Sequence, residues 1–181
     1  MRSVYNSKDF RDASTIENAI SLLNQAIRVD SNYYKAYSNK FMFETQLQQY
    51  KNAMLTGKQM IKLRPDNVET MVSVGSACER AGDTLLSAKY YGRALLILDK
   101  VLDTMSVKNN AYKTLQIGKA IDLILLHQPQ KGYGIFKNIS EKETDPNLKQ
   151  YFQSLLHSSR HDFLYWPSEQ KVTYSTPLSK N

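Results

Sequence analysis

The chain has 181 residues, 41% of them hydrophobic, with a formal net charge of +7 and a single cysteine. This length suits one domain with a core of its own. One cysteine excludes an internal disulfide and a cysteine-pair metal site, and we expect Cys78 to be a small buried hydrophobe. The positive charge is spread thinly without a run of basic residues, so we expect solvated helix faces and no nucleic-acid binding.

No stretch of the sequence reaches the ~18–20 apolar residues of a membrane span, and we expect a protein that does not span a membrane. Residues 1–11 lack the apolar segment of a secretory signal. Two compartments fit: a reducing cytoplasm, which we favour, or an exported, periplasmic location for a mature form whose leader has been removed.

Apolar residues recur at helical spacing along most of the chain, between short polar turns. Pro65 and Gly82 are typical of helix ends, whereas Pro129 and the pair Asp145-Pro146 are typical of helix starts. The predicted helices cover residues 14–29, 33–47, 50–63, 68–81, 84–105, 111–127, 129–139 and 146–159. Residues 1–12 are predicted to be a flexible N-terminus, and the chain from Arg160 onward is predicted to be irregular.

Small and apolar residues repeat along the chain with a period of 34. Ala19, Ala53 and Ser87 keep this step, as do Ala26, Met60 and Ala94. Such a period is the signature of stacked helical hairpins, which build extended docking surfaces and rarely carry catalysis.

These positions resemble the pattern of the tetratricopeptide repeat (TPR) family. The clearest match is residues 68–101, through Gly75, the segment 79–83, Tyr90-Tyr91 and the segment 93–95; residues 34–67 also match. The resemblance implies an all-α, right-handed superhelix (α-solenoid) of antiparallel helical hairpins. It divides the chain into a repeat domain of three to four hairpins with the first one partial (13–143), a capping helix (144–159) and an aromatic-containing irregular tail (160–181).

In this family the first helix of each hairpin lines a concave face. The resemblance therefore implies a partner-binding groove, with positions in three successive units that mix amides, hydroxyls, both signs of charge and some apolar groups. The candidate groove residues are Lys35, Asn39, Met42, Gln46, Glu69, Ser73, Ser76, Arg80, Tyr112, Gln116 and Lys119; the same register adds Ser38, Thr45, Val72, Glu79, Leu115, Asp122 and Leu123. A merely solvated inner face is the alternative.

One departure from the family pattern concerns residue size. The eighth position of a repeat is normally small, yet it is Phe41 in one unit and Gly75 in the next. Sixteen residues later the sizes are reversed, with Gly57 and Tyr91. We expect Phe41 to fill the space left by Gly57, as a volume-conserving exchange in the core.

Motifs for chemistry are missing from the sequence. It has no Gly-rich phosphate loop after a strand and no recognisable nucleophile motif. His157 and His161 have the spacing of two metal ligands on one helix, but no acidic segment completes the set. We therefore expect exposed histidines, no cofactor and no enzyme activity.

The segment 163–167 gathers five large apolar or ring side chains. Leaving them all in water would be costly, so we expect them to pack back as a cap on the last helices. The alternatives are a docking peptide for another molecule and occlusion of the groove by the chain itself.

Together these patterns favour a non-catalytic protein- or peptide-binding scaffold that is a monomer or weak homodimer. The alternative is a small TPR-type chaperone or accessory protein for secreted or envelope partners.

Overall fold

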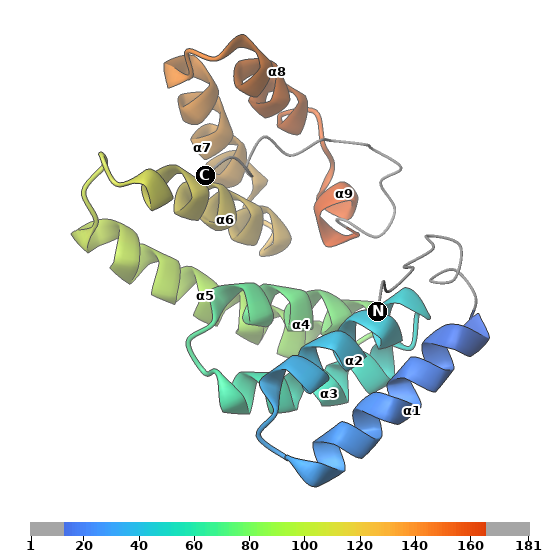
Figure 1. Ribbon diagram of the computed structural model, residues 1–181. Helices are drawn as coiled ribbons and strands as arrows, with labels where there is room; N and C mark the ends of the chain where they lie inside the picture. The colour runs from blue at the N-terminus through green and yellow to red at the C-terminus, as the bar shows by residue number, and fades with distance from the viewer. Residues whose placement is uncertain (1–12, 166–181) are drawn as a thin grey trace, which may run out of the picture.

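The computed structural model describes residues 13–165, and within that range all regular structure is helical (Figure 1). The described part of the chain is all-α, as the sequence predicts. The predicted flexible N-terminus (1–12) and Trp166 and Pro167 of the predicted cap lie outside the described residues. The helices of the described part are α1 (Ala13–Val29), α2 (Tyr34–Gln46), α3 (Tyr50–Leu63), α4 (Val68–Arg80), α5 (Thr84–Thr104), α6 (Asn110–Leu125), α7 (Pro129–Lys142), α8 (Pro146–Leu155) and α9 (Arg160–Leu164).

Short polar turns and side-chain caps fix where the helices begin and end. Asp83 Oδ1 accepts from the Leu86 backbone N–H, and Asp145 Oδ1 accepts from the N–H groups of Asn147 and Leu148. These caps satisfy donors that have no partner inside the helix. Gly82 has φ +91°, a conformation that L residues with a side chain rarely adopt.

Each helix from α1 to α8 packs against the next one along the chain, and α9 breaks this order by packing against α6. In Figure 1, α9 lies between the group α6–α8 and the group α1–α5, close to the end of α4. The neighbouring pairs α2–α3, α4–α5 and α6–α7 are antiparallel hairpins, since turns of only three residues join their helices.

Two apolar clusters hold this stack together. The first gathers α2 to α5 around Met71, Val74 and Ala53, and it includes Cys78, which is fully buried as expected. Burial raises the pKa of the Cys78 thiol to about 11, so it is an inert apolar group at neutral pH. The second cluster gathers α6 to α9 and includes Tyr91 of α5. Because Tyr91 also packs against Gly75 of α4, it connects the two apolar clusters.

The structure corrects two predictions about the last helices of the described part. α8 ends at Leu155, four residues before the predicted end, and the segment predicted as irregular from Arg160 begins with α9. A capping box starts this helix: Ser159 accepts from the Asp162 N–H, and the Asp162 carboxylate accepts from the Ser159 N–H. Five residues contain too little periodicity to reveal a helix in the sequence.

The predicted exchange between Phe41 and Gly57 is also wrong. Phe41 is buried, but the atoms nearest to a Cβ placed on Gly57 belong to Val74. Gly57 therefore lets α3 approach α4 of the next hairpin. At Gly75, by contrast, a Cβ would lie 2.6 Å from Cε1 of Tyr91. The large residue sixteen positions on does fill the space at that glycine.

Within residues 13–165, every helix is either too short or too polar to cross a bilayer.

Candidate functional site

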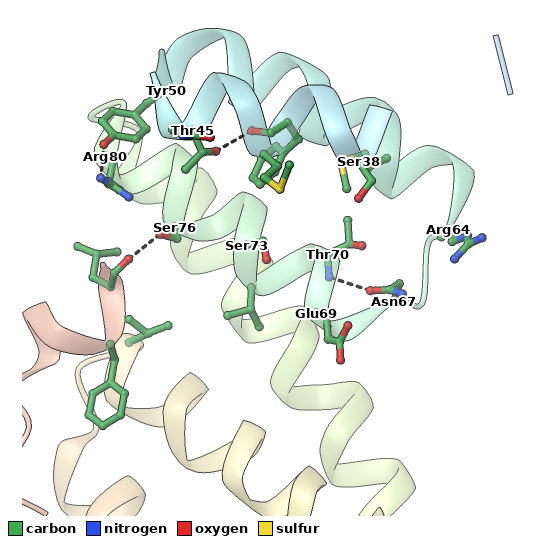
Figure 2. A pocket seen from close by; sticks show the side chains of 18 of the residues that line it. Ser38, Thr45, Tyr50, Arg64, Asn67, Glu69, Thr70, Ser73, Ser76 and Arg80 are labelled. Carbon is green, nitrogen blue, oxygen red and sulfur yellow. Dashed lines mark hydrogen bonds between the residues drawn. The ribbon is translucent and has the colours of Figure 1, made fainter. Parts of the chain in front are cut away.

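A groove runs between α2 and α4, with a volume of about 830 Å³. Figure 2 shows side chains of α2 on one side and side chains of α4 on the other. The contributing positions on each helix recur at three- and four-residue steps, so each helix presents one face to the groove. We call this cavity the α2/α4 groove; it is lined by Tyr34, Ser38, Phe41, Met42, Thr45, Gln46, Gln48, Tyr50, Met60, Arg64, Asn67, Glu69, Thr70, Val72, Ser73, Ser76, Arg80, Leu125, Phe163 and Leu164.

The floor of the α2/α4 groove is apolar and its rim is polar. Phe41 and Met60 are buried beneath it, and Met42, which is 52% exposed, is an apolar exception among the otherwise polar residues of the rim. Among the described residues, the structure records no hydrogen bond or ion pair for the side chains of Ser38, Glu69 and Ser73. The groove therefore offers apolar contact area together with hydroxyl and carboxylate groups that can bond a ligand.

One end of the groove is tied by contacts between its two walls. The Tyr34 hydroxyl lies 2.6 Å from Thr70 Oγ1, and the Thr70 backbone N–H donates to the side chain of Asn67. The Arg64 guanidinium stacks on the Tyr34 ring, 3.9 Å from its centroid. These contacts fix the spacing of α2 and α4 at this end without filling the space between them.

The other end of the groove is occupied by α9. Ser76 Oγ donates to the main-chain carbonyl of Leu164 over 2.9 Å, and the Arg80 guanidinium lies over the ring of Tyr165, 4.3 Å from its centroid. Arg80 also contacts Tyr50 through a hydrogen bond and through the face of its ring. The groove is thus closed at this end by a later segment of the same chain.

Glu79 connects α4, α5 and α9 at this closed end. Its carboxylate accepts a bidentate pair of hydrogen bonds from Arg160, at 2.7 and 2.8 Å. The hydroxyls of Ser87 and Tyr91 donate to the same carboxylate at 3.3 and 3.4 Å. Burial is the main cause that raises the pKa of Tyr91, which keeps its hydroxyl protonated as a donor.

The structure gathers most of the α2 and α4 positions that the sequence assigned to a groove. Nine of those twelve line the cavity: Ser38, Met42, Thr45, Gln46, Glu69, Val72, Ser73, Ser76 and Arg80. Of the other three, Glu79 contacts α9 instead, and Lys35 and Asn39 lie outside the lining.

The candidate positions on α6 do not join this cavity. Lys119 forms a 2.5 Å ion pair with Asp99 of α5, and Gln116 donates to the hydroxyl of Tyr112 on its own helix. Leu123 and Asp122 are buried. The predicted continuation of the groove along α6 is therefore missing, and α9 packs on this helix.

Sequence reasoning also missed residues of the groove that come from outside the repeat pattern. Leu125, Phe163 and Leu164 are among its lining residues. Phe163 and Leu164 belong to the segment predicted as a cap. Both are buried, and the Phe163 ring stacks on Phe136 of α7 at 5.9 Å between centroids. Phe163 and Leu164 thus pack on the last helices, as expected, and also line one end of the groove.

The candidate metal ligands from the sequence, His157 and His161, both lie in the described part of the chain. His157 lies in the turn after α8, whereas His161 lies in α9 and stacks on Tyr165, so the two are not on one helix. Residues 13–165 contain no group of three or more histidine, cysteine, aspartate or glutamate side chains placed to hold a metal ion.

No protein-family model matches the chain, and no curated protein is significantly similar to it in sequence.

Proposed function

We propose that this protein is a non-catalytic scaffold that binds a segment of a partner protein in the α2/α4 groove. In this proposal the hairpins form a TPR-type right-handed superhelix, and the groove belongs to its concave face. The 34-residue period and the agreement between the resemblance and the groove lining support this view.

The observation that carries the proposal is the hydrogen bond from Ser76 to the main chain of Leu164. It is an example of this face of α4 binding a peptide carbonyl. Ser73 lies one turn earlier on α4, also lines the groove, and its hydroxyl is unpaired among the described residues. A segment that continues along the groove can receive the same kind of bond from Ser73, while its side chains contact Phe41 and Met42.

The polar rim explains why a segment of polypeptide is the ligand that fits. A main chain placed in the groove loses water from its N–H and C=O groups, and each needs a new partner. Ser38 on one wall and Ser73 and Glu69 on the other supply acceptors and donors on both sides of the ligand. The apolar floor then selects for large side chains on one face of that ligand.

A blocking substitution tests the proposal. A displayed library of random 12-residue peptides is panned on the immobilised wild-type chain, and an enriched peptide is labelled and titrated by fluorescence anisotropy. Ser73→Trp fills the groove and is expected to weaken binding at least ~10-fold. The matched control is Ser21→Trp, at an exposed position of α1 outside the groove, and it should bind as the wild type does. Equal affinity for both variants would contradict the proposal.

A further inference from the structure

α9 behaves in the structure as a ligand held on a scaffold built by other helices. From α1 to α8 each helix packs on its neighbour in the sequence, whereas the main packing contact of α9 is with α6. A helix of five residues has no stability of its own, because helix nucleation costs more than one turn returns. The position of α9 is therefore set by its contacts with α4, α6 and α7.

The contacts of α9 are of three kinds. Arg160 is the polar anchor: it bonds both carboxylate oxygens of Glu79 and donates to the Leu125 carbonyl at 2.8 and 3.1 Å. Bidentate pairs of this type are strong and geometrically specific. Phe163 and Leu164 are the apolar anchors, buried in the cluster that contains Phe136.

The third kind of contact uses the end of the segment. The Leu164 carbonyl accepts from Ser76, and the Tyr165 ring lies under the Arg80 guanidinium. The three residues of α4 that hold α9 (Ser76, Glu79 and Arg80) are positions that the repeat pattern assigns to the concave face. α9 thus occupies the part of that face where a partner would otherwise bind.

From these contacts we infer that the site formed by Glu79, Ser76, Arg80 and the Leu125 carbonyl recognises a short segment with an arginine three residues before a Phe-Leu-aromatic sequence. α9 is its built-in occupant, and a partner segment with the same chemistry displaces it. The inference rests on the proposed peptide-binding function, because it names the partner chemistry and the self-occupied state of the same groove.

The connection to α8 makes such an exchange physically reasonable. Only the turn residues 156–159 separate the two helices, and a polar contact holds this turn through the Tyr133 hydroxyl and the Ser158 carbonyl. A tethered segment competes at an effective concentration in the millimolar range. An external segment must overcome this, so the wild-type chain binds it weakly, and loss of the Arg160 anchor relieves the competition.

A charge reversal in the full chain tests the inference. The probe is a labelled synthetic peptide with the sequence of residues 157–165, His-Ser-Ser-Arg-His-Asp-Phe-Leu-Tyr. Arg160→Glu places a carboxylate opposite Glu79 and releases α9, and this variant is expected to bind the peptide at least ~10-fold more tightly than the wild type. The matched control is Arg93→Glu, because Arg93 bonds the Pro65 carbonyl away from α9; its affinity should equal that of the wild type.

A reciprocal charge exchange tests whether Glu79 binds the arginine of the peptide. The Glu79→Arg variant is expected to lose binding of the native peptide. It should bind the same peptide with Glu in place of its arginine at least ~10-fold more tightly than it binds the native peptide. If an Arg160→Glu chain with unchanged far-UV circular dichroism does not bind the peptide, or if it loses its helical signal, α9 is an integral part of the core and the inference is overturned.

Hydrogen exchange on the wild-type chain gives a second measurement. The backbone N–H of Phe163 donates to the Ser159 carbonyl, and that of Tyr165 donates to the His161 carbonyl. Both amides are expected to exchange at least ~10-fold faster than the amides of buried α6 residues. Equal protection would overturn the inference. The inference and the function fail separately: binding of a panned peptide that Ser73→Trp abolishes supports the groove even where the α9 peptide does not bind.

Discussion

Asp122 is a residue whose chemistry conflicts with its position. Its side chain is fully buried in α6, and neither carboxylate oxygen has a hydrogen-bond partner among residues 13–165. Burial raises the pKa of this carboxyl from its ordinary value of 3.8 to about 8. A carboxyl in such surroundings is more stable protonated, so Asp122 is neutral at pH 7 in the folded chain.

This pKa predicts how stability depends on pH. In the unfolded chain Asp122 loses its proton near pH 4, whereas in the folded chain it keeps the proton until about pH 8. Because the unfolded state releases the proton first, this group lowers the free energy of unfolding as pH rises through that window, by up to about 1.4 kcal/mol per unit. Asp122→Asn cannot ionise, so urea titrations between pH 4 and 8 should show a flatter profile.

An exposed aspartate provides the control for this measurement. Asp103 lies on α5 and is exposed, so Asp103→Asn should reproduce the wild-type profile. A second variant, Asp122→Leu, has nearly the same shape without the charge and is expected to be more stable than the wild type at pH 8 by about 1–4 kcal/mol. An Asp122→Asn profile as steep as that of the wild type would show that another group causes the dependence.

Replacing Gly57 or Gly92 by alanine is expected to change the stability of the fold in opposite directions. A Cβ on Gly57 would lie 2.9 Å from Val74 Cγ1 and closer still to Cγ2, whereas a Cβ on Gly92 would meet nothing within 4 Å. We expect Gly57→Ala to destabilise the fold by about 1–3 kcal/mol through overpacking. Gly92→Ala should stabilise it by about 0.5–1 kcal/mol, because alanine loses less backbone entropy in a helix.

The double variant Gly57→Ala/Val74→Ala tests whether Val74 is the residue with which a Cβ at position 57 clashes. Val74→Ala makes room for the new methyl group, so the two substitutions together should cost less than the sum of their separate effects in urea unfolding. Additive costs would mean that Val74 is not the residue that requires glycine at position 57.

Among the elements, α9 makes the largest difference between expectation and structure. It is the helix that the sequence did not reveal, and its buried side chains complete the cluster shared by α6, α7 and α8. Because these side chains are buried when α9 is docked, removing one of them should lower the free energy of unfolding.

A matched pair of leucines tests the packing of α9. Leu164 is 8% exposed, whereas Leu85 of α5 is 86% exposed. Leu164→Ala should lower the free energy of unfolding by about 2–4 kcal/mol, and Leu85→Ala should change it by less than about 0.5 kcal/mol. Thermal melts of both variants provide the comparison. A Leu164→Ala chain that melts like the Leu85→Ala chain would mean that α9 contributes little to the fold.

For the whole molecule, the sequence predicts best what is decided locally. Helix starts at Pro129 and Pro146, the turn at Gly82 and the burial of Cys78 follow from propensity, capping and periodicity, and the structure confirms them. The groove positions on α2 and α4 are what the resemblance to the TPR family implied, and nine of those twelve positions line the cavity.

What the sequence did not predict depends on contacts between distant segments. Val74 over Gly57 and Arg160 on Glu79 each join residues that no local pattern connects. Occlusion of the groove by the chain itself was one of the alternatives for the segment 163–167, but the sequence did not show that Leu164 lines the groove. The candidate positions on α6 do not line the groove, also because of contacts between distant segments: Lys119 pairs with Asp99, and α9 packs on this helix.

Chemical-shift mapping shows directly whether the α2/α4 groove is the binding surface. A panned peptide is titrated into the ¹⁵N-labelled full chain, and amide shifts are followed residue by residue. The largest changes are expected at Ser38, Met42 and Ser73, with small changes at the exposed α1 position Ser21. Changes confined to α1 or to the exposed face of α5, with the amides of the groove unmoved, would contradict it.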